Sequence, residues 1–388
     1  FTIEPDDTAD SNTNALTLVV VVHCDKGCMK VSCESSLRVM NETALELEIL
    51  AWHFGSLESA GTVKVGESWP VPLKMAGNGE LRIRPWNDMS TMARSASPLL
   101  VAGTYKQTVE CTYPGEVSIK LDTELFSDAE LVPDKINRLA AKEASSNSYQ
   151  MCVYPPLIIR NFLPNEVTFV AYNGDASGED ANVPERRIGA GQNAQVYTAF
   201  ARHVDGVTLK AFVQATTETN PRASTGEVEG WHGESRIVFD PKKSVSEEMS
   251  LVHTDGQRTM AVRVEFSDRR TITLYAPLWL QNRTGLSLRY KVGSGKHSYW
   301  SDGGSGRTSN RRCAEVCMLP FSDSDSKLFL AVGEGKFGKA EDISELVMKL
   351  WRVQADGYTY TFNLQVDMAP GQLAQTKLVT ITPYFAVA

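Results

Sequence analysis

The sequence predicts an all-β protein built as a tandem array of three β-sandwich repeats. One template that ends in Asn occurs three times along the chain, at nearly equal intervals. After each copy, apolar residues alternate with polar ones, which is the period of half-buried strands. Dipeptides typical of tight hairpin turns recur along the chain, at Asn78-Gly79, Asn173-Gly174, Asp205-Gly206, Asp255-Gly256 and Asp356-Gly357.

Each copy of the template has the same local pattern. A proline or small residue and a Leu open an apolar strand that ends at Asn, and a short turn leads into a second alternating strand. The intervals between the asparagines are 161 − 41 = 120 and 282 − 161 = 121 residues. Such regularity indicates an internal repeat. The three copies read Ser36-Leu-Arg-Val-Met-Asn41, Pro156-Leu-Ile-Ile-Arg-Asn161 and Pro277-Leu-Trp-Leu-Gln-Asn282.

The spacing of the template also predicts domain boundaries. We expect repeat one over residues 1–132, a connector over 133–150, repeat two over 151–265 and repeat three over 266–388. Repeats of about 110 to 120 residues with many short strands suit one β-sandwich each. The best helix candidate is 131–145, with Pro133 near its start, and it would belong to the connector. Segments 216–234 and 301–312 are rich in Gly, Ser, Thr and Asn, which predicts loops.

Composition excludes several classes of protein. Of the 388 residues, 42% are hydrophobic and 22% are charged, which is ordinary for a soluble globular protein. The formal net charge of −8 argues against a nucleic-acid partner, because phosphate binding needs a basic face. No apolar run reaches the roughly 18 to 20 residues of a membrane span. The acidic residues 1–10 do not resemble a targeting signal, and a first residue other than Met suggests a fragment.

The cysteine pattern does not favour a metal site. The seven cysteines include two clusters, and their spacings are C-x3-C and C-x4-C rather than the C-x2-C knuckle of zinc ribbons. We therefore expect reduced structural thiols in a cytosolic protein and no metal or other cofactor, with a shared zinc site as the alternative. The clusters are Cys24, Cys28 and Cys33, and Cys313 and Cys317.

One segment fits a phosphate-binding motif. Residues 333–339, Gly-Glu-Gly-Lys-Phe-Gly-Lys, match G-x-x-x-x-G-K and follow an apolar strand. However, Ala340 stands where the hydroxyl ligand of Mg²⁺ would be, and the surroundings do not read as β-α-β. A glycine-rich β-hairpin is the better interpretation. No G-x-S-x-G elbow occurs either, so the sequence predicts no catalytic residues and no enzyme.

The repeat asparagines Asn41, Asn161 and Asn282 are the candidate site residues. An amide both donates and accepts hydrogen bonds, so a buried Asn can lock the turn between two strands. Alternatively, the same amides could bind an incoming extended peptide. Asn41-Glu-Thr43 and Asn282-Arg-Thr284 are also glycosylation sequons, which we interpret as accidental because they coincide with the repeat.

The repeat residues resemble a known family. The stretches Tyr154-Pro-Pro-Leu-Ile-Ile-Arg-Asn161-Phe-Leu-Pro164 and 271–290 resemble the adaptor-binding (VAB, or SHR-BD) region of the vacuolar protein sorting thirteen family of bridge-like lipid-transfer proteins. Val71-Pro-Leu73 and 318–332 add to the resemblance, which covers nearly the whole chain. There are two departures. Phe337-Gly338 replaces the family's Trp-Ser, and three repeats are found where the family has about six.

The resemblance implies a function. It implies a non-enzymatic protein-binding module that recruits a lipid-transfer protein to organelle membranes through adaptor proteins at membrane contact sites. The partners would be organelle adaptors that present extended peptides, including proline-containing ones. Membrane association would be indirect, and the location cytoplasmic and peripheral. By position, Asn41, Asn161 and Asn282 would support adaptor recognition.

Two alternatives remain open at this point. In the family, Pro-x-Pro peptides dock on the last repeats, and this chain ends as it approaches a fourth copy. The repeats could therefore be structural spacers that orient a more C-terminal adaptor-binding site. An extracellular adhesive array is a third class, against which the lack of a paired-cysteine framework argues.

Overall fold

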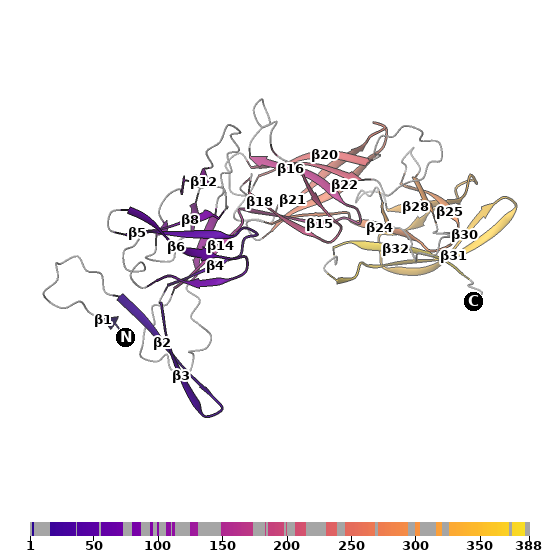
Figure 1. Ribbon diagram of the computed structural model, residues 1–388. Helices are drawn as coiled ribbons and strands as arrows, with labels where there is room; N and C mark the ends of the chain where they lie inside the picture. Colours follow the sequence, from indigo (N-terminus) through magenta and orange to yellow (C-terminus); the bar gives the residue numbers. More distant parts are fainter. Residues whose placement is uncertain are drawn as a thin grey trace. The chain divides into compact units, whose positions relative to one another are not determined.

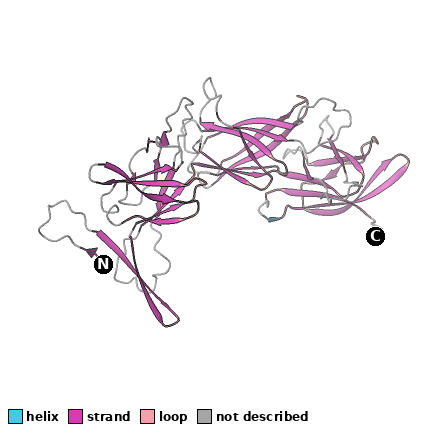
Figure 2. Ribbon diagram, viewed as in Figure 1, coloured by secondary structure: helices cyan, strands magenta, loops and turns pink. Residues whose placement is uncertain are grey.

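The computed structural model describes 22 segments of the chain. All regular structure within them is β-strand, without any α-helix, which confirms the all-β class, while the number of repeats stays a prediction (Figure 2). The helix candidate 131–145 lies outside the described residues. These are 2–3, 16–35, 37–53, 56–72, 80–86, 94–95, 99–100, 106–109, 111–112, 125–130, 149–173, 183, 185–197, 199, 206–214, 230–238, 245–267, 271–293, 299–302, 316–319, 326–371 and 375–384.

The chain divides into two units. Unit one comprises Phe1–Leu157 with Gln195–Phe200, and unit two comprises Ile158–Ala194 with Ala201–Ala388 (Figure 1). No helix in the described part of the chain has the length and apolar character to cross a bilayer.

Unit one has two main sheets that share a core. Buried residues come from both sheets, among them Val39, Leu47, Ile49 and Ile83. The five-stranded sheet runs in the order β11 (Lys106–Val109), β13 (Leu125–Glu130), β14 (Tyr149–Tyr154), β4 (Leu37–Asn41) and β7 (Ser68–Pro70). The four-stranded sheet runs β10 (Leu99–Leu100), β8 (Glu80–Pro85), β5 (Leu47–His53) and β6 (Ser56–Val63).

Two small sheets complete unit one. One pairs β12 (Cys111–Thr112) with β9 (Arg94–Ser95). The other is the sheet β1 (Thr2–Ile3), β2 (Leu16–Asp25) and β3 (Cys28–Ser35), in which β2 and β3 form a long hairpin.

A nine-stranded sheet begins unit two. Its strands alternate buried and half-buried residues, as in β15 and β22, because every second side chain enters the core. The order is β17 (Arg186–Ile188), β16 (Val167–Asn173), β19 (Val207–Gln214), β20 (Gly230–Ile237), β21 (Val245–His253), β22 (Thr259–Ser267), β23 (Thr271–Tyr275), β15 (Leu157–Phe162) and β18 (Asn193–Val196).

Two further sheets of unit two enclose a second core. Trp351 and Tyr290, from different sheets, are its largest fully buried side chains. The five-stranded sheet runs β27 (Val316–Met318), β24 (Leu278–Asn282), β32 (Lys377–Pro383), β31 (Tyr358–Met368) and β30 (Val347–Ala355). The four-stranded sheet runs β26 (Tyr299–Asp302), β25 (Ser287–Val292), β28 (Lys327–Val332) and β29 (Glu341–Asp342).

Each template strand pairs in parallel with a strand that comes about a hundred residues later. β14 pairs with β4, β23 with β15, and β32 with β24. The predicted domain boundaries stay a prediction. The pairing nevertheless joins Tyr149–Tyr154 to the first template strand and Thr271–Tyr275 to the second.

The two expected loops are partly strand. Gly230–Glu234 belongs to β20 and Ser301 to β26, so the loop prediction for 216–234 and 301–312 was wrong at these ends. The reason is tertiary: Trp231 is only 5% exposed, and a Cβ on Gly233 would lie 2.5 Å from the Ser250 carbonyl oxygen. Close packing therefore requires the small residues that locally suggested a loop.

Candidate functional site

The first candidate site is the turn that follows β4. Asn41 is fully buried, and its Nδ2 donates to the carbonyl oxygens of Leu45 at 2.7 Å and Val63 at 3.0 Å. Its Oδ1 accepts from the backbone N–H of Thr43 at 3.0 Å and from the Thr43 hydroxyl at 2.7 Å. The side chain thus ties the turn to β6 and satisfies all its donors and acceptors inside the protein.

Asn161 and Asn282 have nearly the same environment. Both are fully buried. Asn161 donates to the carbonyl oxygens of Asn165 at 2.8 Å and Ile188 at 3.1 Å, and Asn282 donates to those of Leu286 and Ser301, both at 2.8 Å. The structure therefore places the three predicted residues in one local motif, at the ends of β4, β15 and β24.

The two sequons have a structural explanation. The hydroxyl of Thr284 donates to Asn282 Oδ1 at 2.7 Å, as Thr43 does to Asn41. In the second copy Leu163 holds this position, and Asn161 Oδ1 accepts only its backbone N–H, at 2.9 Å. The Asn-x-Thr sequence therefore supplies a second donor to the buried amide oxygen, and no glycan could be attached to either amide in the folded chain.

The closing strands contact the same turns. The N–H of Glu42 donates to the Val153 carbonyl oxygen at 2.8 Å, and that of Arg283 donates to the Ile381 carbonyl oxygen at 2.8 Å. The register pairs Val153 with Asn41 and Ile381 with Asn282. The residue after each of these two asparagines is thus fixed by the strand that closes the copy.

The turn after β4 has a further cover within unit one. The N–H of Ala44 lies 2.5 Å from Oε1 of Gln195 and 3.0 Å from the Tyr197 hydroxyl oxygen. Gln195 also donates to the Glu42 carbonyl oxygen at 3.3 Å. Segment Gln195–Phe200 comes from the sequence of the second copy but groups with unit one. Sequence reasoning missed this contact, because local patterns carry no sign of it.

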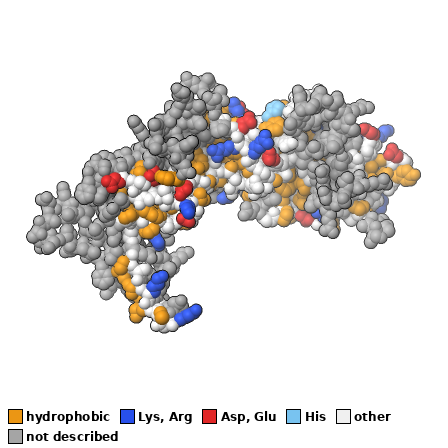
Figure 3. All heavy atoms as spheres, in the orientation of Figure 1, with side chains coloured by type: hydrophobic (Ala, Val, Ile, Leu, Met, Phe, Trp, Pro, Cys, Tyr) orange, Lys and Arg blue, Asp and Glu red, His pale blue; other side chains and the backbone are white. Residues whose placement is uncertain are grey.

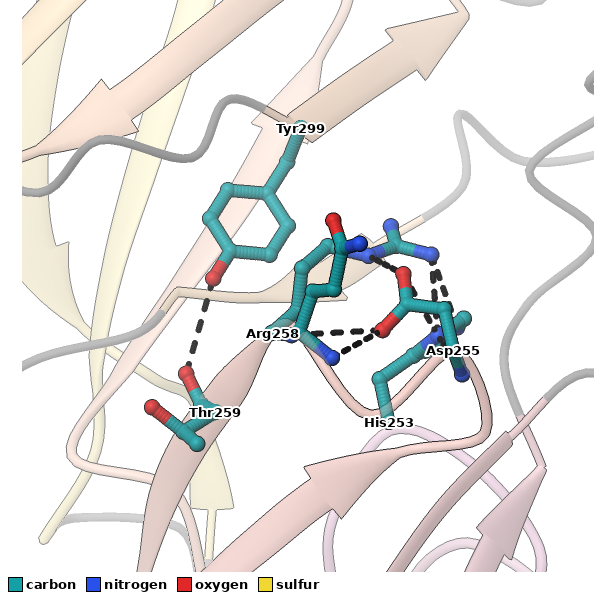
Figure 4. Close-up of polar contacts among 6 residues, drawn as sticks. His253, Asp255, Arg258, Thr259 and Tyr299 are labelled. Carbon is teal, nitrogen blue, oxygen red and sulfur yellow. Dashed lines mark hydrogen bonds and ion pairs between the residues drawn. The ribbon is translucent and has the colours of Figure 1, made fainter.

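A second polar cluster lies in unit two at the turn between β21 and β22 (Figure 4). The buried His253 ring packs edge-on against Trp231, with ring centroids 4.8 Å apart, and Arg258 Nη2 lies 2.9 Å from His253 Nε2. Asp255 Oδ2 accepts from Arg258 Nε at 2.7 Å. The Tyr299 hydroxyl of β26 reaches the Thr259 carbonyl oxygen at 3.5 Å. The cluster joins the nine-stranded sheet to the four-stranded sheet.

This cluster predicts an effect of acid on stability. Partial burial alone would raise the pKa of Asp255, but hydrogen bonds from Gln257 and Arg258 outweigh it and hold that pKa well below its usual range. A lowered pKa contributes stability above the unfolded value of about 4, and this is lost as the pH falls further. We expect Asp255→Asn to lower stability at pH 7 and to reduce the loss on acidification, measured by urea unfolding at neutral and acidic pH. An unchanged pH dependence would contradict this role.

The motifs that suggested enzyme or metal chemistry are placed differently. Residues 333–339 connect β28 to β29, which pair antiparallel, so this segment is a glycine-rich hairpin connection. In the described residues no three His, Cys, Asp or Glu side chains come together as a metal site. Cys24, Cys28 and Cys33 are exposed on β2 and β3, Cys317 lies on β27, and Cys313 is outside the described residues.

A hollow of about 430 Å³ lies over β16, β19 and β20 of unit two. Phe212 and Val170 provide apolar surface, and Lys210, His232 and Glu234 carry the polar groups. Lys210 Nζ lies 3.6 Å from Glu234 Oε2. These two charges face each other, so the hollow suits contact with a side chain better than acid–base chemistry.

The comparison with protein families decides the identity. The model of the family "Vacuolar-sorting associated protein 13, adaptor binding domain" matches residues 6–388. The chain belongs to this family. None of the curated proteins compared with it matches. The family resemblance stated from the repeat residues is therefore confirmed, and the chain is an adaptor-binding, hence protein-binding, domain.

Proposed function

We propose that this adaptor-binding domain recruits a lipid-transfer protein to organelle membranes by binding adaptor proteins at membrane contact sites. The observation that supports it most is the family match over residues 6–388. The domain would act in the cytoplasm, peripheral to the membrane, and its partners would be organelle adaptors with extended peptides, including proline-containing ones. We expect no catalytic turnover.

The β30 edge offers a place for such a peptide. β30 is the outermost strand of its sheet, and Leu346, Met348 and Leu350 beside it or on it are 58%, 70% and 46% exposed. A free edge with apolar side chains binds extended peptides by adding a strand. Lys349, which could protect such an edge, is held back by Glu341 Oε2 at 2.8 Å.

The direction of the β30 backbone groups follows from the neighbouring strands. The N–H of Tyr384 donates to the Thr361 carbonyl oxygen at 3.1 Å, so the backbone of Thr361 faces away from β30. Its neighbour Phe362 therefore faces β30, where it pairs with Trp351. Leu350, one residue earlier, then directs its N–H outward, toward the site of an added strand.

A binding experiment tests the proposal. Proteins captured from cytosolic extract would be identified by mass spectrometry and rebound as purified adaptors. We expect Leu350→Pro, which removes the outward N–H, to abolish capture, and the matched Leu350→Thr, which keeps it, to weaken capture only modestly. Equal binding by both variants would exclude strand addition at β30, and no adaptor bound by wild type would contradict the function.

The engaged amides favour a second candidate function. Because Asn41, Asn161 and Asn282 use their side-chain amides inside the repeats, these copies would also suit a spacer that orients a more C-terminal adaptor site. The test is a triple Asn→Ser variant shown to be folded by circular dichroism. Loss of adaptors from this folded variant would support recognition by the asparagines, whereas a wild type that captures none would support the spacer.

A further inference from the structure

The β2–β3 hairpin of unit one is long and tightly turned. Its register runs from the pair Leu18–Ser35 to the pair Asp25–Cys28. Lys26 and Gly27 have φ of 48° and 81°, the left-handed conformation of a two-residue turn that matches the strand twist. Within the described residues only the two-residue β1 adds to its sheet. Because a two-stranded hairpin alone is marginally stable in water, a surface that covers it would stabilise it.

One face of this hairpin is apolar and uncovered. Cross-strand pairing sets Val22 beside Val31 and Cys24 beside Met29. Val22 is 55%, Val31 58% and Met29 74% exposed, and the cysteines on the hairpin are exposed. We call this set of side chains the apolar face: Val20, Val22, Cys24, Met29, Val31 and Cys33. The alternate positions Cys28, Lys30 and Ser32 lie on the opposite face.

Basic residues accompany the apolar face at the tip. Lys26 and Lys30 are exposed, and residues 20–33 hold these two lysines and one Asp, a formal charge of +1 in a chain of −8. Figure 3 shows hydrophobic side chains along the hairpin and the lysines toward its end. An element with one apolar face and basic residues beside it is typical of the interface of an anionic membrane.

We propose that the apolar face of the β2–β3 hairpin lies in the interface of an anionic lipid bilayer, with Lys26 and Lys30 among the headgroups. The face is two side chains wide, and residues 16–35 contain no Trp, Tyr, Phe or Arg, the residues that anchor most protein interfaces. A weak direct contact of this kind would add to adaptor binding, because one attachment raises the effective concentration of the other. It does not depend on the proposed adaptor function.

The native cysteines report this contact face by face. Cys24 belongs to the apolar face and Cys28 to the opposite one, four residues away in the sequence. The chain would be mixed with phosphatidylcholine–phosphatidylserine vesicles and treated with a charged, water-soluble maleimide, and each cysteine followed by peptide mass spectrometry. We expect these vesicles to slow modification of Cys24 several-fold and to leave Cys28 nearly unchanged, with little effect from pure phosphatidylcholine.

Two variants separate the apolar and electrostatic contributions in vesicle co-sedimentation. Val22→Thr with Val31→Thr keeps the shape and strand propensity of a cross-strand pair but adds hydroxyls, and it should weaken binding by about tenfold. Lys26→Ala with Lys30→Ala should weaken binding to phosphatidylserine vesicles and leave the pure phosphatidylcholine result unchanged.

The outcomes are decisive in either direction. Absence of wild-type co-sedimentation, or equal protection of Cys24 and Cys28, would overturn the proposal, as would full binding by the double threonine variant. Protection of Cys24 only when a protein partner is added would likewise show that a protein covers this face. If the threonine variant fails to fold, the cysteine measurement on wild type still decides, because it needs no substitution.

Discussion

Replacement of Asn282 by Ala is expected to lower the free energy of unfolding of its copy by about 3 to 5 kcal/mol. The substitution leaves the carbonyl oxygens of Leu286 and Ser301 and the donors of Thr284 without their partner, all in or beside a fully buried site. Each buried group left unpaired costs about 1 to 3 kcal/mol. Hydrogen exchange resolved by peptide is the suitable measurement, because a chain with several sheets need not unfold in two states.

Two matched variants test whether the effect depends on this network. Asn173 makes one such bond, from Nδ2 to the Gly206 carbonyl oxygen at 3.0 Å, so Asn173→Ala should cost about 1 kcal/mol. Thr284→Leu imitates the second copy, where Leu163 replaces the threonine, and should also cost about 1 kcal/mol. Similar losses in all three variants would show that the amide of Asn282 is not what holds the turn.

Replacement of Trp351 by Ala is expected to destabilise the third copy by about 3 to 5 kcal/mol. The Trp351 side chain is 1% exposed, and its Nε1 donates to the Lys339 carbonyl oxygen at 3.0 Å. The substitution would leave a large cavity between the two sheets and would free the 333–339 connection. Urea unfolding followed by fluorescence and by hydrogen exchange of residues 333–355 measures both effects.

The controls vary the cavity and the hydrogen bond separately. Trp351→Phe keeps much of the buried volume and should cost less than Trp351→Ala, while it still releases Lys339. Trp86, which is 41% exposed, serves as a surface control, and Trp86→Ala should change stability by less than about 1 kcal/mol. If Trp351→Ala and Trp86→Ala had the same effect, Trp351 would not be a core residue.

Local chemistry made part of the fold predictable. Asp356-Gly357 has φ of 51° and 80°, as expected for a two-residue hairpin turn, and it joins β30 to β31. Alternation also predicted correctly that Leu47 and Val167 would be buried. The Lys26-Gly27 turn was missed, because Lys is not among the residues that commonly take a left-handed conformation there.

Other features depend on partners far apart in the sequence and left no local sign. β20 begins at Gly230 because Gly230 pairs with Gln214 across a long segment. The cluster of Asp255, Arg258 and Tyr299 forms only when two sheets meet, and none of its members has a distinctive sequence context. Similarly, Leu16–Val22 read as one apolar strand, but the exposed face that it shares with β3 follows only from their register.

The parallel pairing of each first strand with its last has a consequence for synthesis on the ribosome. The paired residues are separated by 149 − 37 = 112, 271 − 158 = 113 and 377 − 278 = 99 positions. A nascent copy therefore exposes an open sheet edge until about a hundred further residues have emerged, and such long-range closure is slow. Translation pauses or early truncation within a copy should leave a chaperone-dependent, aggregation-prone intermediate, whereas truncation just after a closing strand should not.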